Sequence, residues 1–227
     1  MATTQALAPE VLGHPSLERP FFHRFSTGTI RTVVRLFTHT RQIGRERIPM
    51  RGPLVVVSNH VQWVDPVILG ALFPRPVIFM AKQELWRKNW VGWVVERYGA
   101  FPVRRGEADR TAIRRGLSIL EAGGAVGIFP EGTRSKSTQL GAPHPGASLI
   151  ALKSGAPVLP VAFTGTLGMG GKGWVGRWPR VTITYGEPFV LSAASGEGKG
   201  RLVEGTETIM RRIAALLPEE LRGTYGD

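Results

Sequence analysis

The chain has 227 residues, of which 42% are hydrophobic and 20% charged; 29 Lys and Arg against 17 Asp and Glu give a formal charge of +12. This length suits one sizeable α/β domain with an N-terminal extension. The positive charge implies an anionic partner: a membrane surface, a nucleic acid, a phosphorylated substrate or an acidic carrier protein. The absence of cysteine excludes disulfides, thiolate catalysis and cysteine-ligated metal. The five histidines show no spacing that suggests a metal site.

The first 49 residues precede the first clear strand. Residues 1–20 contain three prolines and no hydrophobic periodicity, which predicts a flexible arm. From residue 21, apolar side chains recur at helical spacing beside a basic stripe, at Ile30, Val33, Val34 and Phe37 and at Arg24, Arg31 and Arg35. We expect residues 21–49 to form an amphipathic helical segment that contacts a membrane; the alternative is a helix that packs on the domain. The domain itself is expected over residues 50–227.

Membrane attachment is expected to be peripheral. No apolar run approaches the ~20 residues that span a bilayer. The N-terminus also lacks the basic and apolar regions of a secretory signal. We therefore expect a protein on the cytoplasmic side of a bacterial-type cell membrane, attracted to its anionic surface.

Short apolar stretches alternate with helical patterns from residue 50 onward. Strands are predicted at 54–57, 77–80, 100–103, 125–129, 158–163 and 181–185, and helices at 66–73, 83–97, 107–121, 146–154 and 200–217. Such alternation predicts an α/β fold with a mostly parallel central sheet and helices on both faces, preceded by the N-terminal amphipathic helical segment.

Polar clusters follow three of these strands directly. His60 follows the first strand, Arg104 and Arg105 follow the third, and the turn from Glu131 to Arg134 follows the fourth. Because ligands of parallel sheets bind beyond the carboxyl ends of the strands, we expect these clusters to meet at one edge.

His60 and Asp65 together predict a general base. A neutral imidazole accepts a proton near physiological pH, and a carboxylate on its other nitrogen fixes the tautomer. The alternative is that Asp65 only caps the helix that begins at Pro66 and that His60 is a polar loop residue. The chain has no cysteine and no G-x-S-x-G elbow. A base without a protein nucleophile would activate a substrate hydroxyl directly, with no covalent intermediate.

Four stretches in series resemble the motifs of the PlsC-like glycerolipid acyltransferases, the lysophosphatidic acid acyltransferase family. They are Asn59-His60-x4-Asp65 (H-x4-D), residues 99–105 (GAFPVRR), residues 129–135 (FPEGTRS) and residues 158–161 (VLPV). The resemblance covers roughly residues 50–190. The second motif departs from the family pattern, because Arg104 stands where an acidic residue is common.

The resemblance implies transfer of a fatty acyl group to the hydroxyl of lysophosphatidic acid, giving phosphatidic acid. Acyl-CoA or acyl-acyl carrier protein would be the co-substrate, with no bound cofactor and no metal. By position, His60 would be the base and Asp65 would orient it. The implied substrate-binding residues are Arg104, Arg105, Glu131, Gly132, Thr133 and Arg134, and the site-shaping residues are Asn59, Pro130 and Pro160. Arg105 and Arg134 would hold the acceptor phosphate, and Glu131 would anchor the glycerol hydroxyls or brace its turn.

Other functions remain open at this point. Within the enzyme class, the acceptor could be glycerol 3-phosphate or another lysophospholipid. Outside the enzyme class, the chain could be a basic module that binds a membrane or a nucleic acid. No nucleic-acid-binding motif is present, however, and we expect no nucleic acid as a partner. Residues 168–173 match G-x-G-x-x-G without opening a helix, so residues 165–180 are predicted to be a loop.

Three tryptophans lie on one face of the helix predicted at 83–97. Trp86, Trp90 and Trp93 follow one another at spacings of four and three residues, so their side chains share one side of a helix. Such a face is usually part of the core, but it could also floor an acyl pocket or touch lipid.

Overall fold

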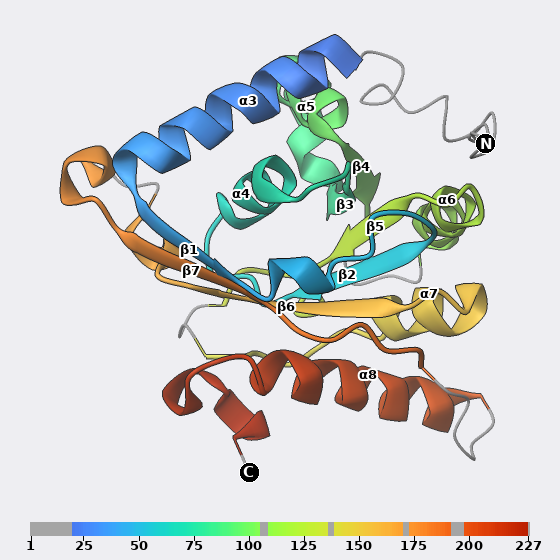
Figure 1. Ribbon diagram of the computed structural model, residues 1–227. Coiled ribbons are helices and arrows are strands. Elements are labelled where there is room, and N and C mark those ends of the chain that lie inside the picture. The colour runs from blue at the N-terminus through green and yellow to red at the C-terminus, as the bar shows by residue number, and fades with distance from the viewer. Residues whose placement is uncertain (1–19, 105–108, 136–138, 170–172, 192–197, 227) are drawn as a thin grey trace, which may run out of the picture.

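The computed structural model describes residues 20–104, 109–135, 139–169, 173–191 and 198–226 (Figure 1). Its centre is a seven-stranded sheet in the order β1-β7-β6-β2-β5-β3-β4. The strands are β1 His39–Ile43, β2 Leu54–Ser58, β3 Ile78–Lys82, β4 Ala100–Val103, β5 Ala125–Ile128, β6 Val158–Thr164 and β7 Arg180–Tyr185. Strands β2 to β6 run parallel to one another, β7 is antiparallel to β6, and β1 is parallel to β7. The predicted α/β fold with a mostly parallel sheet is confirmed.

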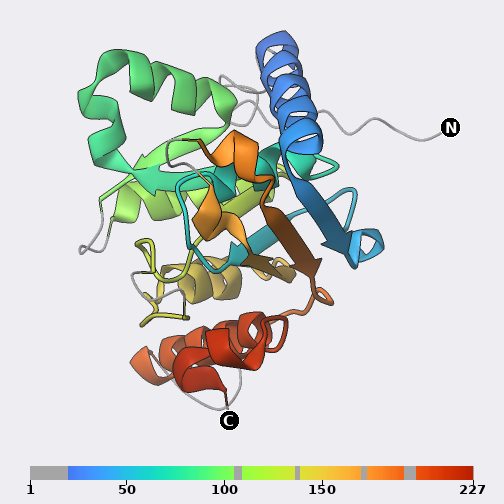
Figure 2. The same ribbon diagram turned by 90° about the vertical axis from the view of Figure 1, so that its left-hand side faces the viewer.

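Helices cover both faces of this sheet. They are α3 Pro20–Phe37, α4 Asp65–Leu72, α5 Asn89–Tyr98, α6 Arg110–Glu121, α7 Gly146–Ser154 and α8 Lys199–Ala214. Helices α3, α4 and α5 lie on one face, and α6, α7 and α8 lie on the other (Figures 1 and 2). Two apolar cores result. Because Leu54 and Val56 join one core and Val55 and Val57 the other, β2 is buried on both sides, which explains its unbroken apolar sequence.

The segment 21–49 is not one continuous helix: it contains α3, a strand and the short 3-10 helix Arg45–Arg47. Helix α3 ends at Phe37, and β1 follows as an edge strand of the sheet, paired with β7 from His39 to Ile43. This strand was not predicted because it is short and polar, with only alternate residues partly covered. The predicted arm lies outside the described residues, apart from Pro20, where α3 begins.

The predicted helix at 83–97 is divided into two pieces. A 3-10 helix, Gln83–Arg87, is followed by α5, which begins at Asn89. Of the three tryptophans, Trp86 packs on the core, whereas Trp90 is 72% exposed and Trp93 is 50% exposed. Trp90 and Trp93 of this aromatic face therefore lie mostly at the surface, where Trp93 also contacts Phe22 of α3.

The predicted loop at 165–180 contains two short 3-10 helices, Thr166–Gly168 and Trp174–Arg177, and ends where β7 begins at Arg180. Residues 170–172, in the middle of the G-x-G-x-x-G stretch, lie outside the described residues. Among the helices that the structure does describe, none has the length and hydropathy needed to cross a membrane.

Gly127 in β5 leaves room for an aromatic ring of the neighbouring strand β3. A Cβ at this position would collide with the ring of Phe79 on the neighbouring strand β3. We expect Gly127→Ala to lower the free energy of unfolding by about 1–3 kcal/mol, because the buried ring must move.

The matched control is Gly28→Ala in α3, where a Cβ would meet nothing within 4 Å. A helix-interior alanine there should be neutral or stabilise by up to about 1 kcal/mol. Urea unfolding of both variants measures the difference. Equal stability of the two variants would contradict this packing argument.

Candidate active site

His60 and Asp65 form a hydrogen-bonded pair at the carboxyl end of β2. Oδ2 of Asp65 lies 3.0 Å from Nδ1 of His60, and it also accepts the amide hydrogens of Val61 at 2.7 Å and Gln62 at 2.6 Å. A carboxylate only accepts, so Nδ1 carries the proton that is donated and Nε2 keeps its lone pair. Asp65 is fully buried. The pair therefore has the geometry of a general base with its orienting carboxylate.

Asp65 does not cap α4 as the sequence suggested. The helix begins at Asp65 itself, and Val64 occupies the N-cap position without a capping side chain. The carboxylate points back to the turn that precedes the helix, where three N–H groups converge on one oxygen. Its local role is to hold that turn as well as the imidazole.

Glu131 joins the ends of two strands. Its Oε1 accepts the amide hydrogen of His60 at 2.9 Å, and its Oε2 accepts that of Gly141 at 2.9 Å. The amide of Ser135 donates to the carbonyl of His60 at 2.8 Å. Burial raises the pKa of Glu131, an effect that these two amide hydrogen bonds partly offset. Two roles were predicted for Glu131, to anchor the glycerol hydroxyls or to brace its turn. Because both carboxylate oxygens accept backbone amides, the geometry favours the bracing role.

Phe129 provides the apolar side of the imidazole. Its ring lies 4.3 Å from that of His60, centroid to centroid, at 29°, and it also stacks on Phe79 at 6.0 Å. We did not predict a role for this residue from the sequence. Its position at the end of β5, directly before Pro130, is the signal that could have identified it.

Gly132 is required by its conformation and by its neighbour. Its φ of +64° favours glycine, and a Cβ there would collide with the ring of His144. The amide of His144 donates to the carbonyl of Pro130 at 2.8 Å, which holds the loop before α7 against the turn that contains Gly132. His144 was not predicted, because it is distant in sequence from the turn that it contacts.

Arg104 finds its acidic partner five residues further along the chain. The amide of Arg104 donates to Oδ2 of Asp109 at 2.9 Å, and its Nε lies 3.6 Å from the same oxygen. Asp109 also caps α6 by accepting the amides of Thr111 and Ala112. These contacts hold the pKa of Asp109 below its usual range, chiefly through the Arg104 amide. Asp109 thus supplies the negative charge that the second motif lacks. Arg105 lies outside the described residues.

An apolar cavity of about 390 Å³ opens beside these residues. Its lining includes Arg104, Phe129, Pro130, Gly132 and His144, together with Met80, Val103, Asp109, Ile113, Ile128, Pro145, Gly146, Ala147, Leu149 and Leu202. The structure therefore brings the second and third motifs to one cavity. The stacked rings of Phe129 and His60 connect that cavity to the pair of His60 and Asp65.

The remaining predicted residues divide into buried and exposed ones. The side-chain amide of Asn59 joins β2 to β6, donating to the Phe163 carbonyl at 2.9 Å and accepting its amide at 2.7 Å. Pro160 is buried in β6 opposite Val57, and it is not among the residues that line the cavity. Thr133 and Arg134 are exposed on the turn after Glu131. Within the described part of the chain, no group of three acidic or histidine side chains could hold a metal ion.

Substitution of Glu131 tests the bracing geometry. A glutamine offers one oxygen where two backbone amides need acceptors, so we expect Glu131→Gln to lower the free energy of unfolding by about 1–3 kcal/mol. The exposed Glu204→Gln on α8 is the matched control and should be neutral. Denaturant unfolding checks both variants, and a Glu131→Gln protein as stable as the wild type would argue against the brace.

Comparison with known proteins identifies acyltransferases as similar to this chain. A family model described as Acyltransferase matches residues 39–164. The 1-acyl-sn-glycerol-3-phosphate acyltransferase of Bacillus subtilis is 30% identical over 197 residues, 86% of this chain and 96% of that protein. The enzyme of the same name from Streptococcus pneumoniae is 33% identical over 178 residues, 76% of this chain and 63% of that protein.

A solved structure shares the fold. The crystal structure of the 1-acyl-sn-glycerophosphate (LPA) acyltransferase PlsC from Thermotoga maritima aligns with a TM-score of 0.65 at 28% identity, over 89% of this chain and 80% of that one. The family model spans more than half of the chain and contains the His60 turn and the Glu131 turn. The chain therefore belongs to the PlsC-like acyltransferase family, and it is an enzyme of the 1-acylglycerol-3-phosphate O-acyltransferase type.

Proposed function

We propose that this enzyme transfers a fatty acyl group from an acyl thioester to the free hydroxyl of lysophosphatidic acid, giving phosphatidic acid. The observation that carries the proposal is the pair of His60 and Asp65, joined at 3.0 Å beside a largely apolar cavity. The names of the relatives support lysophosphatidic acid as the acceptor.

In the proposed reaction, Nε2 of His60 takes the proton of the acceptor hydroxyl while the oxygen attacks the thioester carbonyl. Asp65 stabilises the imidazolium that forms. The tetrahedral intermediate then collapses, the carbon–sulfur bond breaks, and the imidazolium returns its proton to the leaving thiolate. One ester forms for each thioester broken, and no acyl group becomes attached to the protein.

The acceptor phosphate is proposed to lie at the basic side of the site. Arg104 lines the cavity, Arg134 is exposed on the turn after Glu131, and Arg105 follows Arg104 in the chain. Guanidinium groups suit bidentate phosphate binding. In this arrangement Gly132 and Thr133 bring the backbone of the turn close to the headgroup. The apolar walls of the cavity suit a fatty acyl chain.

We also propose peripheral membrane binding through α3 and α5, on the cytoplasmic side of the cell membrane. On α3, Phe21 is 82% exposed and Phe25 is 66% exposed, and on α5 Trp90 and Trp93 are also exposed. An edge contact between Phe22 and Trp93, with centroids 5.6 Å apart, joins the two helices. Exposed aromatic rings next to arginines are typical of proteins that lie in a lipid interface.

Release of free thiol tests the reaction. We expect the wild type to release thiol from acyl-CoA or from acyl-acyl carrier protein when lysophosphatidic acid is present, and less with glycerol 3-phosphate or no acceptor. His60→Ala should reduce the rate by about 10²–10⁴-fold because the base is lost. Asp65→Asn should also reduce it, because an amide does not stabilise the imidazolium.

His39→Ala is the control for loss of a histidine, since His39 is exposed on β1 away from the site. It should retain wild-type activity. Full activity of folded His60→Ala would refute the proposed mechanism. So would thiol release that is the same with and without an acceptor, whichever of the two acyl donors is used. A preference for glycerol 3-phosphate would instead change the acceptor and keep the base.

Vesicle binding tests the proposed membrane surface. We expect Phe21→Ser/Phe25→Ser/Trp90→Ser to bind vesicles of phosphatidylcholine and phosphatidylglycerol about tenfold or more weakly, because three apolar side chains no longer enter the interface. Point substitutions are preferable to deletion of α3, since Val34 of that helix belongs to the core.

Val203→Ser is the matched control, because Val203 is equally exposed but lies on α8, across the sheet from α3. It should sediment with vesicles as the wild type does. Unchanged sedimentation of the triple variant would place the membrane contact elsewhere.

A further inference from the structure

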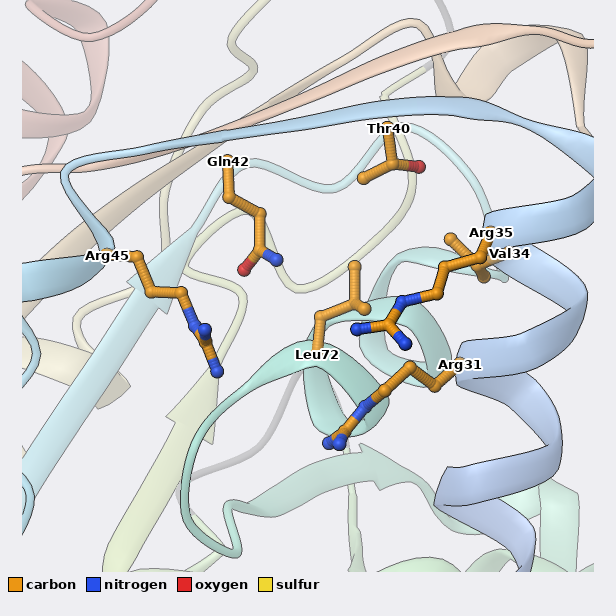
Figure 3. Close-up of a pocket in the computed structure, with 7 residues that line it drawn as sticks. All are labelled: Arg31, Val34, Arg35, Thr40, Gln42, Arg45 and Leu72. Carbon is orange, nitrogen blue, oxygen red and sulfur yellow. The ribbon is translucent and has the colours of Figure 1, made fainter.

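A basic pocket, distinct from the apolar cavity, lies between α3, β1 and the end of α4 (Figure 3). Its cavity is about 120 Å³, and its lining is Arg31, Val34, Arg35, Thr40, Gln42, Arg45 and Leu72. Arg31 and Arg35 extend from α3, and Arg45 extends from the other side, out of the 3-10 helix Arg45–Arg47. Three of the seven lining residues are therefore arginines, and none is acidic.

Two of the polar side chains are held in place by partners outside the pocket. Nε and Nη2 of Arg31 donate to the Ala71 carbonyl at 3.2 and 2.8 Å, which fixes its guanidinium at the end of α4. Oε1 of Gln42 accepts the hydroxyl of Tyr185 at 3.1 Å. Burial raises the pKa of Tyr185 far above neutrality, so this hydroxyl remains a donor. The amide nitrogen of Gln42 is therefore the end that faces away from Tyr185, and it adds a neutral donor to the arginines.

The charge of the pocket is not balanced by the described part of the chain. No described Asp or Glu forms an ion pair with Arg31, Arg35 or Arg45. By contrast, Arg47, two residues after Arg45, pairs with Glu187 at 2.8 Å. Guanidinium groups held around one small cavity repel one another, and a bound anion would remove that cost. Planar donor forks and an amide suit the oxygens of a phosphate group.

This pocket is separate from the active site. In the sheet order, β1 lies three strands from β2, which is roughly 14 Å at the usual strand spacing. Leu72 ends α4 and Asp65 begins it, so the two sites also lie at opposite ends of that helix, roughly 11 Å apart along its axis. The phosphate of an acceptor whose hydroxyl meets His60 cannot reach the pocket, because glycerol separates the two groups by only a few bonds.

We propose that the pocket formed by Arg31, Arg35, Gln42 and Arg45 binds a phosphate group, carried by an anionic lipid headgroup or free in solution. The lipid source is favoured by the position of the pocket, because Leu36, beside Arg35 on α3, is 61% exposed and shares the outer side of the helix with Phe21 and Phe25. The site requires neither acyl transfer nor His60.

The first experiment measures inorganic phosphate binding to the full chain by calorimetry. Gln42→Glu keeps the oxygen that accepts from Tyr185 and places a negative charge in the pocket, and Arg35→Gln removes one guanidinium. We expect either change to weaken binding about tenfold or more. Arg41→Gln is the matched control. It removes one guanidinium, as Arg35→Gln does, and Arg41 is next to Gln42 on β1 but lies on the opposite side of that strand, outside the pocket.

The second experiment measures sedimentation of the same proteins with vesicles of phosphatidylcholine alone, or with added phosphatidic acid or phosphatidylglycerol. Loss of binding to the phosphate-bearing anionic vesicles in Gln42→Glu and Arg35→Gln, but not in Arg41→Gln, identifies a lipid headgroup as the source. Loss confined to inorganic phosphate identifies a soluble phosphate.

The proposal is overturned if Arg41→Gln loses as much as Arg35→Gln, which would mean general charge attraction. It is also overturned if folded Gln42→Glu matches the wild type in both experiments. Circular dichroism and the melting temperature establish that each variant is folded. Because no step measures acyl transfer, failure here leaves the proposed reaction untouched, and failure of that reaction leaves the pocket testable.

Discussion

The buried carboxylate of Asp65 is the constraint on which the site depends. A carboxylate removed from water is costly unless hydrogen-bond donors surround it, and here three N–H groups from residues 60–62 converge on Oδ2. The same contacts shape the turn and select the histidine tautomer. The backbone conformation and the imidazole of His60 are therefore coupled, because neither His60 nor its turn can move without loss of donors to a buried charge.

The sheet supplies the second requirement, which is that distant segments meet at one edge. The strands β2, β4 and β5 are parallel, so His60, Arg104 and Glu131 all leave their strands on the same side. Glu131 then ties the segment after β5 to the segment after β2, because its carboxylate accepts the amide hydrogen of His60. Its second oxygen engages Gly141, which extends the brace to the loop that closes the cavity. Backbone amides, which cannot rotate away, make this support rigid.

The arginines that contribute to the net charge of +12 differ in whether a carboxylate balances them. Arg104 is partly balanced by Asp109 at the cavity beside Phe129, and Arg47 is paired with Glu187. The cluster of Arg31, Arg35 and Arg45 has no such balance among the described residues. The arginine stripe of α3 is therefore not uniform in the fold: Arg31, anchored on the Ala71 carbonyl, and Arg35 line the pocket, whereas Arg24 is not among its lining residues. Charge by itself identifies an anionic partner, and only the neighbours of each arginine indicate where it binds.

Local patterns in the sequence were enough to determine the parallel α/β sheet, the edge where the polar clusters meet, the family and the pair His60 and Asp65. These features depend on apolar periodicity and on residues only a few positions apart. The tertiary structure alone decided the features that depend on distant contacts. The strand β1 is polar and exists because β7 pairs with it. The outward face of Trp90 depends on whether another element covers it. The donor orientation of Gln42 comes from Tyr185, 143 positions away in the chain. Sequence periodicity indicates which faces of an element are apolar. Which element covers a face, or which residue orients a side chain, depends on contacts between residues that are distant in the chain and is determined only by the tertiary structure.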